Sequence, residues 1–91
     1  MNTPTKIHSF VSHDNESLHT RIESLDYDTS IWAFYYDNII RVTSVVCRAD
    51  VNYSAQEYFN SKDFSSAKNA LDWFNAEHRF ILNNYYNVSN I

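Results

Sequence analysis

The 91-residue chain contains no glycine, one proline and a single cysteine, Cys47. Because it has no glycine, it cannot form the glycine-rich loops that hold phosphates in nucleotide-binding motifs. Because it has one cysteine, it cannot form an intrachain disulfide, which argues against a secreted disulfide framework. It also lacks an apolar run long enough for a signal peptide or a membrane span. These absences predict a protein of the cytoplasm.

Basic residues are scarce as well. Seven Lys and Arg stand against eleven Asp and Glu, for a formal net charge of −4. Nucleic-acid binding depends on clustered Lys and Arg, so this balance argues against direct binding and favours attraction to a basic partner. The hydrophobic fraction of 44% and the aromatic fraction of 16% are ample for a core. The length fits one domain over residues 1–91.

The first third of the chain predicts a strand and a helix. Residues 6–11, KIHSFV, alternate weakly and fit a short edge strand. A helix is predicted over 15–25, because Leu18, Ile22 and Leu25 recur at helical spacing.

An aromatic hairpin follows. Residues 30–36, SIWAFYY, predict a strand, 37–38 a two-residue turn, and 39–49 a second strand. The register that this turn predicts pairs Tyr36 with Ile39, Phe34 with Arg41 and Trp32 with Thr43 on one face, and Tyr35 with Ile40, Ala33 with Val42 and Ile31 with Ser44 on the other. Both faces are substantially apolar, so helices should cover one of them. The face with Trp32 and Phe34 then needs a second cover, such as another subunit.

The last third predicts a strand over 51–59, a loop over 60–63 and a helix over 65–85, capped by Ser65 or Asp63. The apolar stripe of this helix comprises Ala67, Ala70, Leu71, Phe74, His78, Ile81, Leu82 and Tyr85. The element order is therefore β-α-β-β-β-α. It predicts an α+β fold: an antiparallel sheet of three or four strands with a short N-terminal helix and a long C-terminal helix.

Catalytic and metal-binding patterns are missing. Cys47 falls in the middle of a predicted strand without an obvious His partner, so a nucleophilic site is not indicated. His13 and His19 are six residues apart, which is not a metal-ligand spacing. Asp26 and Asp28 resemble the acids of an ordinary turn more than an acid–base pair. The sequence therefore predicts no enzyme, no metal and no cofactor.

The acids are unevenly spread. Eight of the eleven fall within residues 14–57, among three basic residues: Asp14, Glu16, Glu23, Asp26, Asp28, Asp37, Asp50 and Glu57. If the first helix and the strand ends share an edge, these acids form a strip. Carboxylates spaced like phosphates can occupy the basic cleft of a DNA-binding protein. The alternative is a solvated acidic face without a partner.

Two resemblances carry different expectations. The order α-β-β-β-α over 15–85, with FSSAKNALDWF opening the last helix, resembles a double-stranded RNA-binding domain. In that family the last helix starts with a lysine cluster, of which Lys68 alone is matched, while Ser65 and Ser66 occupy expected basic positions. This resemblance implies the fold without the RNA activity, used as a non-enzymatic protein-interaction adaptor.

The second resemblance concerns size and character. The short, glycine-free, acidic chain, rich in Asn and Tyr and with an aromatic hairpin, resembles the anti-restriction nuclease protein family (Arn) of T-even bacteriophages. It implies a homodimeric DNA mimic in the host cytoplasm, whose eight acids replace DNA phosphates and inhibit a modification-dependent restriction endonuclease. The partner would be a host DNA-binding or nuclease protein. The expected dimer contact is Trp32, Phe34 and Tyr36, or Trp73 and Phe80. A plain dimeric structural module is the third reading.

Overall fold

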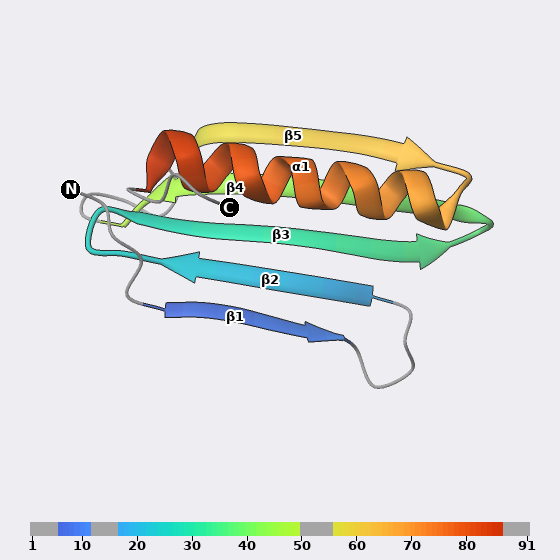
Figure 1. Ribbon diagram of the computed structural model, residues 1–91, viewed down its shortest axis with the longest axis horizontal. Coiled ribbons are helices and arrows are strands. Elements are labelled where there is room, and N and C mark those ends of the chain that lie inside the picture. The colour runs from blue at the N-terminus through green and yellow to red at the C-terminus, as the bar shows by residue number, and fades with distance from the viewer. Residues whose placement is uncertain (1–5, 12–16, 50–55, 87–91) are drawn as a thin grey trace.

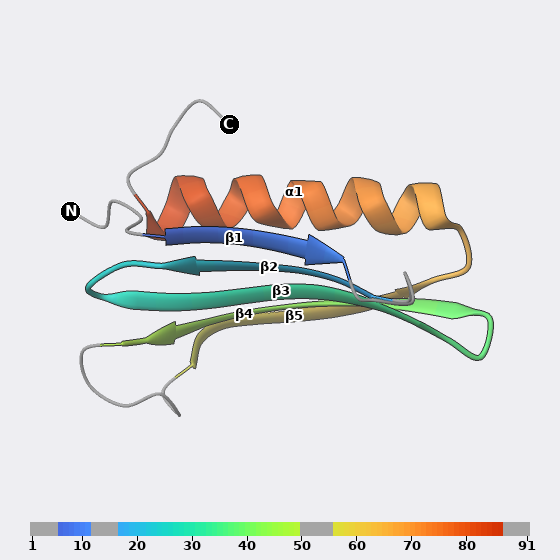
Figure 2. The same cartoon turned by 90° about the horizontal axis from the view of Figure 1, so that it is seen from below.

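A computed structural model describes residues 6–11, 17–49 and 56–86. Its elements are β1 (Lys6–Val11), β2 (Ser17–Glu23), β3 (Tyr27–Tyr36), β4 (Ile39–Arg48), β5 (Gln56–Phe64) and α1 (Ala67–Tyr85). The five strands form one antiparallel sheet in the order β1-β2-β3-β4-β5, and α1 lies along one face of it, roughly parallel to the strands (Figures 1 and 2). The α+β class is therefore confirmed, with a sheet wider than the predicted three or four strands.

The aromatic hairpin forms as predicted. Asp37 and Asn38 connect β3 to β4 with φ angles of 55° and 64°. Two successive positive φ angles are typical of the tight hairpin turns whose twist matches that of the strands, and Asp and Asn tolerate them better than most residues. The resulting register is the predicted one, from Tyr36 opposite Ile39 to Ile31 opposite Ser44.

The predicted helix over 15–25 is wrong over the part that the structure describes, because β2 occupies it between β1 and β3. Leu18 and Ile22 are four residues apart, a spacing that also fits one face of a strand. Thr20, between them, is buried on that same face. Leu25, which completed the helical pattern, is 85% exposed in the turn before β3. Strand pairing with β3 therefore decides the conformation of this segment.

Strand boundaries also differ from the prediction. β3 begins at Tyr27, three residues before the predicted start of this strand at residue 30. β5 runs through the predicted loop 60–63, because its residues continue to alternate between the two sides of the sheet as far as Phe64. Of the strand predicted over 51–59, residues 51–55 lie outside the described residues.

The C-terminal helix packs on β3, β4 and β5. Its N-cap is Ser66, whose hydroxyl accepts a hydrogen bond from the Asn69 amide at 3.4 Å, one residue away from the predicted Ser65. The buried apolar residues lie between the helix and the sheet: Ile22, Ile31, Val42, Val46, Ala70, Phe74, Ile81, Leu82 and Tyr86. The predicted stripe is correct at its centre and wrong at its start, where Ala67 and Leu71 are exposed.

Tyr86, just after the helix, closes the far end of the core. Its hydroxyl donates a hydrogen bond to the Ile22 carbonyl at 3.1 Å and lies 2.7 Å from the Thr29 hydroxyl. Both partners are buried, so Tyr86 ties the end of α1 to β2 and β3 by polar contacts inside the core. Burial raises the pKa of Tyr86 to about 12.

Candidate interaction surface

No described element covers the sheet face opposite α1, which we call the open face. Four of its side chains form what we call the apolar strip: Trp32, Phe34, Val45 and Phe59. Phe34 is 48% exposed, although its strand β3 is paired on both sides. Phe59 is 57% exposed on β5, which is paired with β4. Large aromatic side chains in this setting commonly mark an interaction site.

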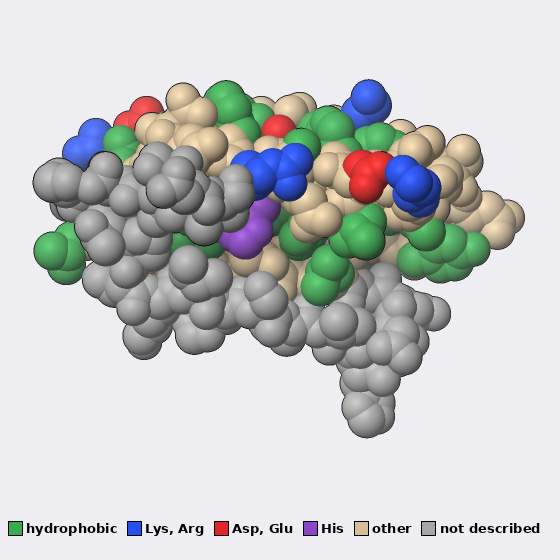
Figure 3. Space-filling view, in the orientation of Figure 1, with side chains coloured by type: hydrophobic (Ala, Val, Ile, Leu, Met, Phe, Trp, Pro, Cys, Tyr) green, Lys and Arg blue, Asp and Glu red, His purple; other side chains and the backbone are tan. Residues whose placement is uncertain are grey.

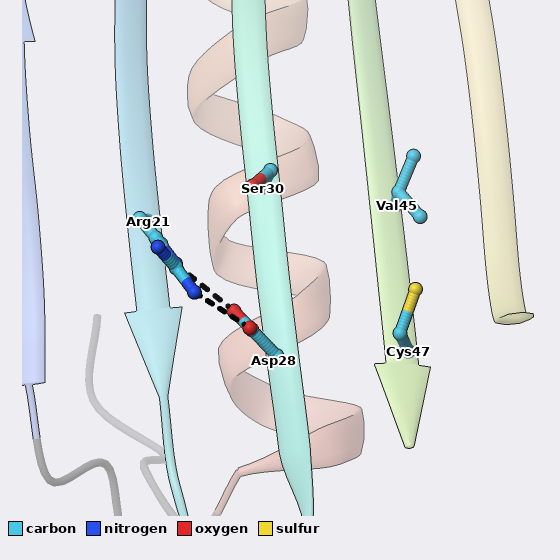
Figure 4. Close-up of a pocket in the computed structure, with 5 residues that line it drawn as sticks. All are labelled: Arg21, Asp28, Ser30, Val45 and Cys47. Atoms are coloured by element: carbon cyan, nitrogen blue, oxygen red, sulfur yellow. Dashed lines mark hydrogen bonds and ion pairs between the residues drawn. The ribbon is translucent and has the colours of Figure 1, made fainter. Parts of the chain in front are cut away.

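Two arginine–carboxylate pairs lie on either side of the apolar strip. Arg21 of β2 binds Asp28 of β3 through both carboxylate oxygens, at 3.1 and 2.7 Å (Figure 4). Arg41 of β4 binds Asp63 of β5 in the same way, at 2.7 and 3.0 Å. We call these the β2–β3 ion pair and the β4–β5 ion pair. The Arg41 hydrogen bond lowers the pKa of the Asp63 carboxyl, so that pair is fully charged at neutral pH.

The centre of the open face is polar but satisfied. Thr43 is 7% exposed, and its hydroxyl lies 3.0 Å from that of Ser61 on the neighbouring strand. Because each hydroxyl already has a partner, covering this part of the face would leave neither group without a hydrogen bond. The open face therefore combines exposed aromatic rings, charges that are paired within the chain and satisfied hydroxyls.

A shallow hollow of about 120 Å³ lies beside the β2–β3 ion pair, lined also by Ser30, Val45 and Cys47 (Figure 4). Burial, and then the Asp28 carboxylate, raise the pKa of the Cys47 thiol. A thiol with a raised pKa is protonated at neutral pH and is a poor nucleophile. The hollow therefore contains no activated nucleophile, and it is a shallow depression in the surface of the open face.

Of the eight predicted DNA-mimicking acids, the five that the structure describes lie at two ends of the sheet. Asp14, Glu16 and Asp50 lie outside the described residues. Glu23, Asp26 and Asp28 gather around the turn between β2 and β3, and Glu57 is the second residue of β5, at the same end of the sheet. Asp37 lies at the other end of β3, which puts it roughly 30 Å away along the strand.

Most of the described acids take part in ion pairs within the chain. Ion pairs join Glu23 and Asp28 to Arg21, Glu57 to Arg48, Asp63 to Arg41 and Asp72 to Lys68. Asp26 and Asp37 make no ion pair with the described residues. On the helix side of the molecule, acidic and basic side chains are interspersed with apolar ones (Figure 3).

The two predicted dimer contacts lie on opposite sides of the sheet. Trp32 and Phe34 are on the open face. Trp73 and Phe80 are on the helix side, where Trp73 packs on Phe64 with ring centroids 5.8 Å apart and Phe80 packs on Tyr58 at 5.3 Å. They flank the core next to β5, so they cannot join the open face in one contact.

Tyr36, the third aromatic residue of that predicted contact, ends β3, and its side chain lies outside the described part of the chain. Its backbone pairs with Ile39 across the turn.

Sequence reasoning missed Glu77, a buried carboxylate in the middle of α1. Its Oε1 atom accepts hydrogen bonds from Ser44 at 2.6 Å, from the Tyr58 hydroxyl at 2.7 Å and from Asn60 at 3.3 Å. Burial and the bond to Glu77 raise the pKa of Tyr58. Glu77 is three residues after Phe74 and four before Ile81, so its position on the buried face was available from the helical period. Its contacts tie α1 to β4 and β5.

The histidines offer no site among the described residues. His19 stands edge-on to Trp32, with centroids 6.2 Å apart, and burial followed by Arg21 lowers its pKa. His78 is half-buried on α1, and burial followed by Arg79 lowers its pKa. Within the described ranges, no group of three or more His, Cys, Asp and Glu side chains is arranged to hold a metal. His13 lies outside those ranges.

No protein-family model matches the chain, and comparisons with curated proteins and with solved structures found no match. The resemblance to double-stranded RNA-binding domains depended on a first helix, and the described elements run as five strands followed by one helix. Lys68, the matching lysine, bonds to Asp72 at 2.8 Å. No helix among the described residues combines the length and the apolar character that a membrane span requires.

Proposed function

We propose that the protein is a non-catalytic protein-interaction module that binds through the open face of its sheet. The observation that carries this proposal is the apolar strip, with Phe34 and Phe59 about half exposed between two ion pairs. Aromatic residues surrounded by a polar rim are typical of the energetic centre of protein interfaces. The partner presents a largely apolar surface, because the arginines and carboxylates beside the apolar strip are already paired within the chain.

A nucleic-acid partner fits the open face less well. Proteins that stack bases on exposed aromatic rings place these rings in a positively charged groove that holds the phosphates. Here Arg21 and Arg41 each bind a carboxylate through two hydrogen bonds. A phosphate would have to displace that carboxylate and would meet its negative charge nearby. The formal net charge of −4 adds to this repulsion.

The DNA-mimic hypothesis remains a prediction of the sequence. It needs carboxylates that face a basic cleft without being neutralised first, and most described acids are held by arginine or lysine. Exposed ion pairs of this kind leave little net field for a distant cation. The geometry therefore supports apolar docking better than electrostatic mimicry, and one experiment separates them.

The experiment uses the immobilised chain as bait for a bacterial lysate that also contains soluble copies of the chain, at low and at high salt, with and without duplex DNA. The test variant carries Phe34→Ser and Phe59→Ser on the open face, and the matched control carries Phe80→Ser on the helix side. Apolar docking predicts that capture of a protein persists at high salt and in the presence of duplex DNA. It also predicts that the test variant loses this capture and that the control keeps it.

Three other outcomes have definite meanings. Capture that salt or duplex DNA abolishes would support mimicry and identify its target. Retention of a single-stranded oligonucleotide by the chain itself would overturn the choice of a protein partner. Capture that does not depend on Phe34 and Phe59, with both variants folded by circular dichroism, would overturn the proposed function.

A further inference from the structure

We infer that the partner at the open face is a second copy of this chain, related to the first by a two-fold axis that runs along the apolar strip. The inference rests on the proposed function, because it names the occupant of the same face. The two copies therefore contact each other through the side with Trp32 and Phe34, and not through the side with Trp73 and Phe80.

The pattern of the open face suits self-association. Cross-strand pairing places Thr43 opposite Trp32 and Ser61, and Val45 opposite Phe59. The apolar strip therefore crosses the face diagonally, from Phe34 on β3 to Phe59 on β5, with Thr43 near its middle. The β2–β3 ion pair lies on one side of this diagonal and the β4–β5 ion pair lies on the other.

A two-fold axis along the diagonal matches both parts of the pattern. It lays the apolar strip of one copy on that of the other, as a two-fold interface requires of a surface that binds itself. It also brings the β4–β5 ion pair of the second copy toward the β2–β3 ion pair of the first. Asp63 of the second copy then approaches Arg21, so cations and anions alternate across the contact.

The other simple axis lacks this charge match. An axis drawn across the apolar strip would set Arg21 against Arg21 of the second copy, and Asp63 against Asp63. Like charges placed directly together are unfavourable at an interface. The arrangement of the two ion pairs therefore selects the axis along the strip.

The open face is large enough for such a contact. Four strands spaced about 4.8 Å apart, each with about nine residues of 3.3 Å rise, cover roughly 20 Å by 30 Å. Two such faces bury roughly 1,200 Å² in total, where the range of specific protein interfaces begins. Because the hydroxyls of Thr43 and Ser61 are already bonded to one another, burying them leaves no new unsatisfied group.

Sedimentation equilibrium of the purified chain over a wide concentration range tests the inference. The wild type is expected to form a dimer, and Phe59→Glu or Phe34→Glu to raise its dissociation constant about tenfold or more, as for an interface hot spot. Phe80→Glu introduces the same charge in place of an exposed ring on the helix side, and it should leave the dimer intact. If a glutamate variant fails to fold, the serine variants at the same positions replace it.

A charge reversal tests the axis. Asp63→Lys removes the anion that approaches Arg21 of the second copy, and the dissociation constant should rise. Asp72→Lys, on the outer side of α1, makes the same charge change and should have no effect. Equal effects of the two reversals would overturn the axis along the strip.

The inference and the proposed function fail in different ways. A monomer at every concentration, with capture of another protein that still depends on Phe34 and Phe59, would overturn the second copy and leave the proposed function standing. A dimer that Phe80→Glu breaks and Phe59→Glu spares would assign self-association to the helix side. A monomer without any capture that depends on those rings would overturn both.

Discussion

The same strands form both faces of the sheet, but the two faces differ in what their side chains contact. On the helix side, Ile31 and Val42 are fully buried, and the carboxylate of Glu77 is held by neutral donors. On the open face, Phe34 and Phe59 stay about half exposed, and the carboxylates are held by arginines. The apolar residues of the sheet that lie beneath α1 are therefore stabilising, whereas large aromatic residues of the open face stay partly exposed.

The largest effect on stability is expected from a comparison of two phenylalanines, one on each side of the sheet. Phe74 is 3% exposed between α1 and the sheet, whereas Phe59 is 57% exposed on the open face. Phe74→Ala should lower the free energy of unfolding by about 3–5 kcal/mol, through lost burial and a cavity. Phe59→Ala in the monomer should lower it by less than about 1 kcal/mol. Urea unfolding followed by circular dichroism measures both, and similar losses would contradict the division into a core face and a binding face.

A second test concerns the buried polar network. Glu77→Ala removes the acceptor for Ser44 and for the Tyr58 hydroxyl, and should cost about 2–3 kcal/mol of unfolding free energy because buried donors are left unsatisfied. Glu77→Gln keeps a carbonyl acceptor and should cost about 1 kcal/mol or less. The comparison is made by urea unfolding at neutral pH. Equal losses for the two variants would mean that the negative charge, rather than the acceptor, matters at this position.

The smallest expected effect involves Tyr86 and depends on pH. Its pKa is raised from 10 to about 12, mainly by burial, so the neutral form is favoured in the folded chain. The unfolded chain therefore loses this proton first, and the contribution of Tyr86 to stability, present below pH 10, should decline between pH 10 and 12. Tyr86→Phe should cost about 1–2 kcal/mol at neutral pH, because the Ile22 carbonyl loses its donor.

The measurement is the unfolding free energy of wild type and Tyr86→Phe between neutral pH and pH 12. The difference in unfolding free energy between the two proteins should decrease as the pH rises from 10 to 12. A constant gap would show that Tyr86 titrates in the folded chain as it does in the unfolded one.

Short-range chemistry made part of the fold predictable. The turn at Asp37 and Asn38 depends on the conformations open to those residues, and one turn sets the whole register of β3 and β4. The helical stripe from Ala70 to Leu82 was recognisable because a long helix repeats its period several times. The same register showed that residues on both faces of the hairpin are apolar. The second cover inferred from that pattern stays a prediction.

The remaining features depend on contacts between distant segments. Leu18 and Ile22 fit a helix and a strand equally well, and β2 exists because β3 offers it hydrogen-bonding partners. Glu77 is buried because Ser44, Tyr58 and Asn60, all distant in sequence, surround its carboxylate. The arginines that neutralise Asp28 and Asp63 reach them across neighbouring strands. Local conformational preference therefore set the hairpin and the long helix, whereas strand pairing and packing decided which face α1 covers and which acids keep their charge exposed.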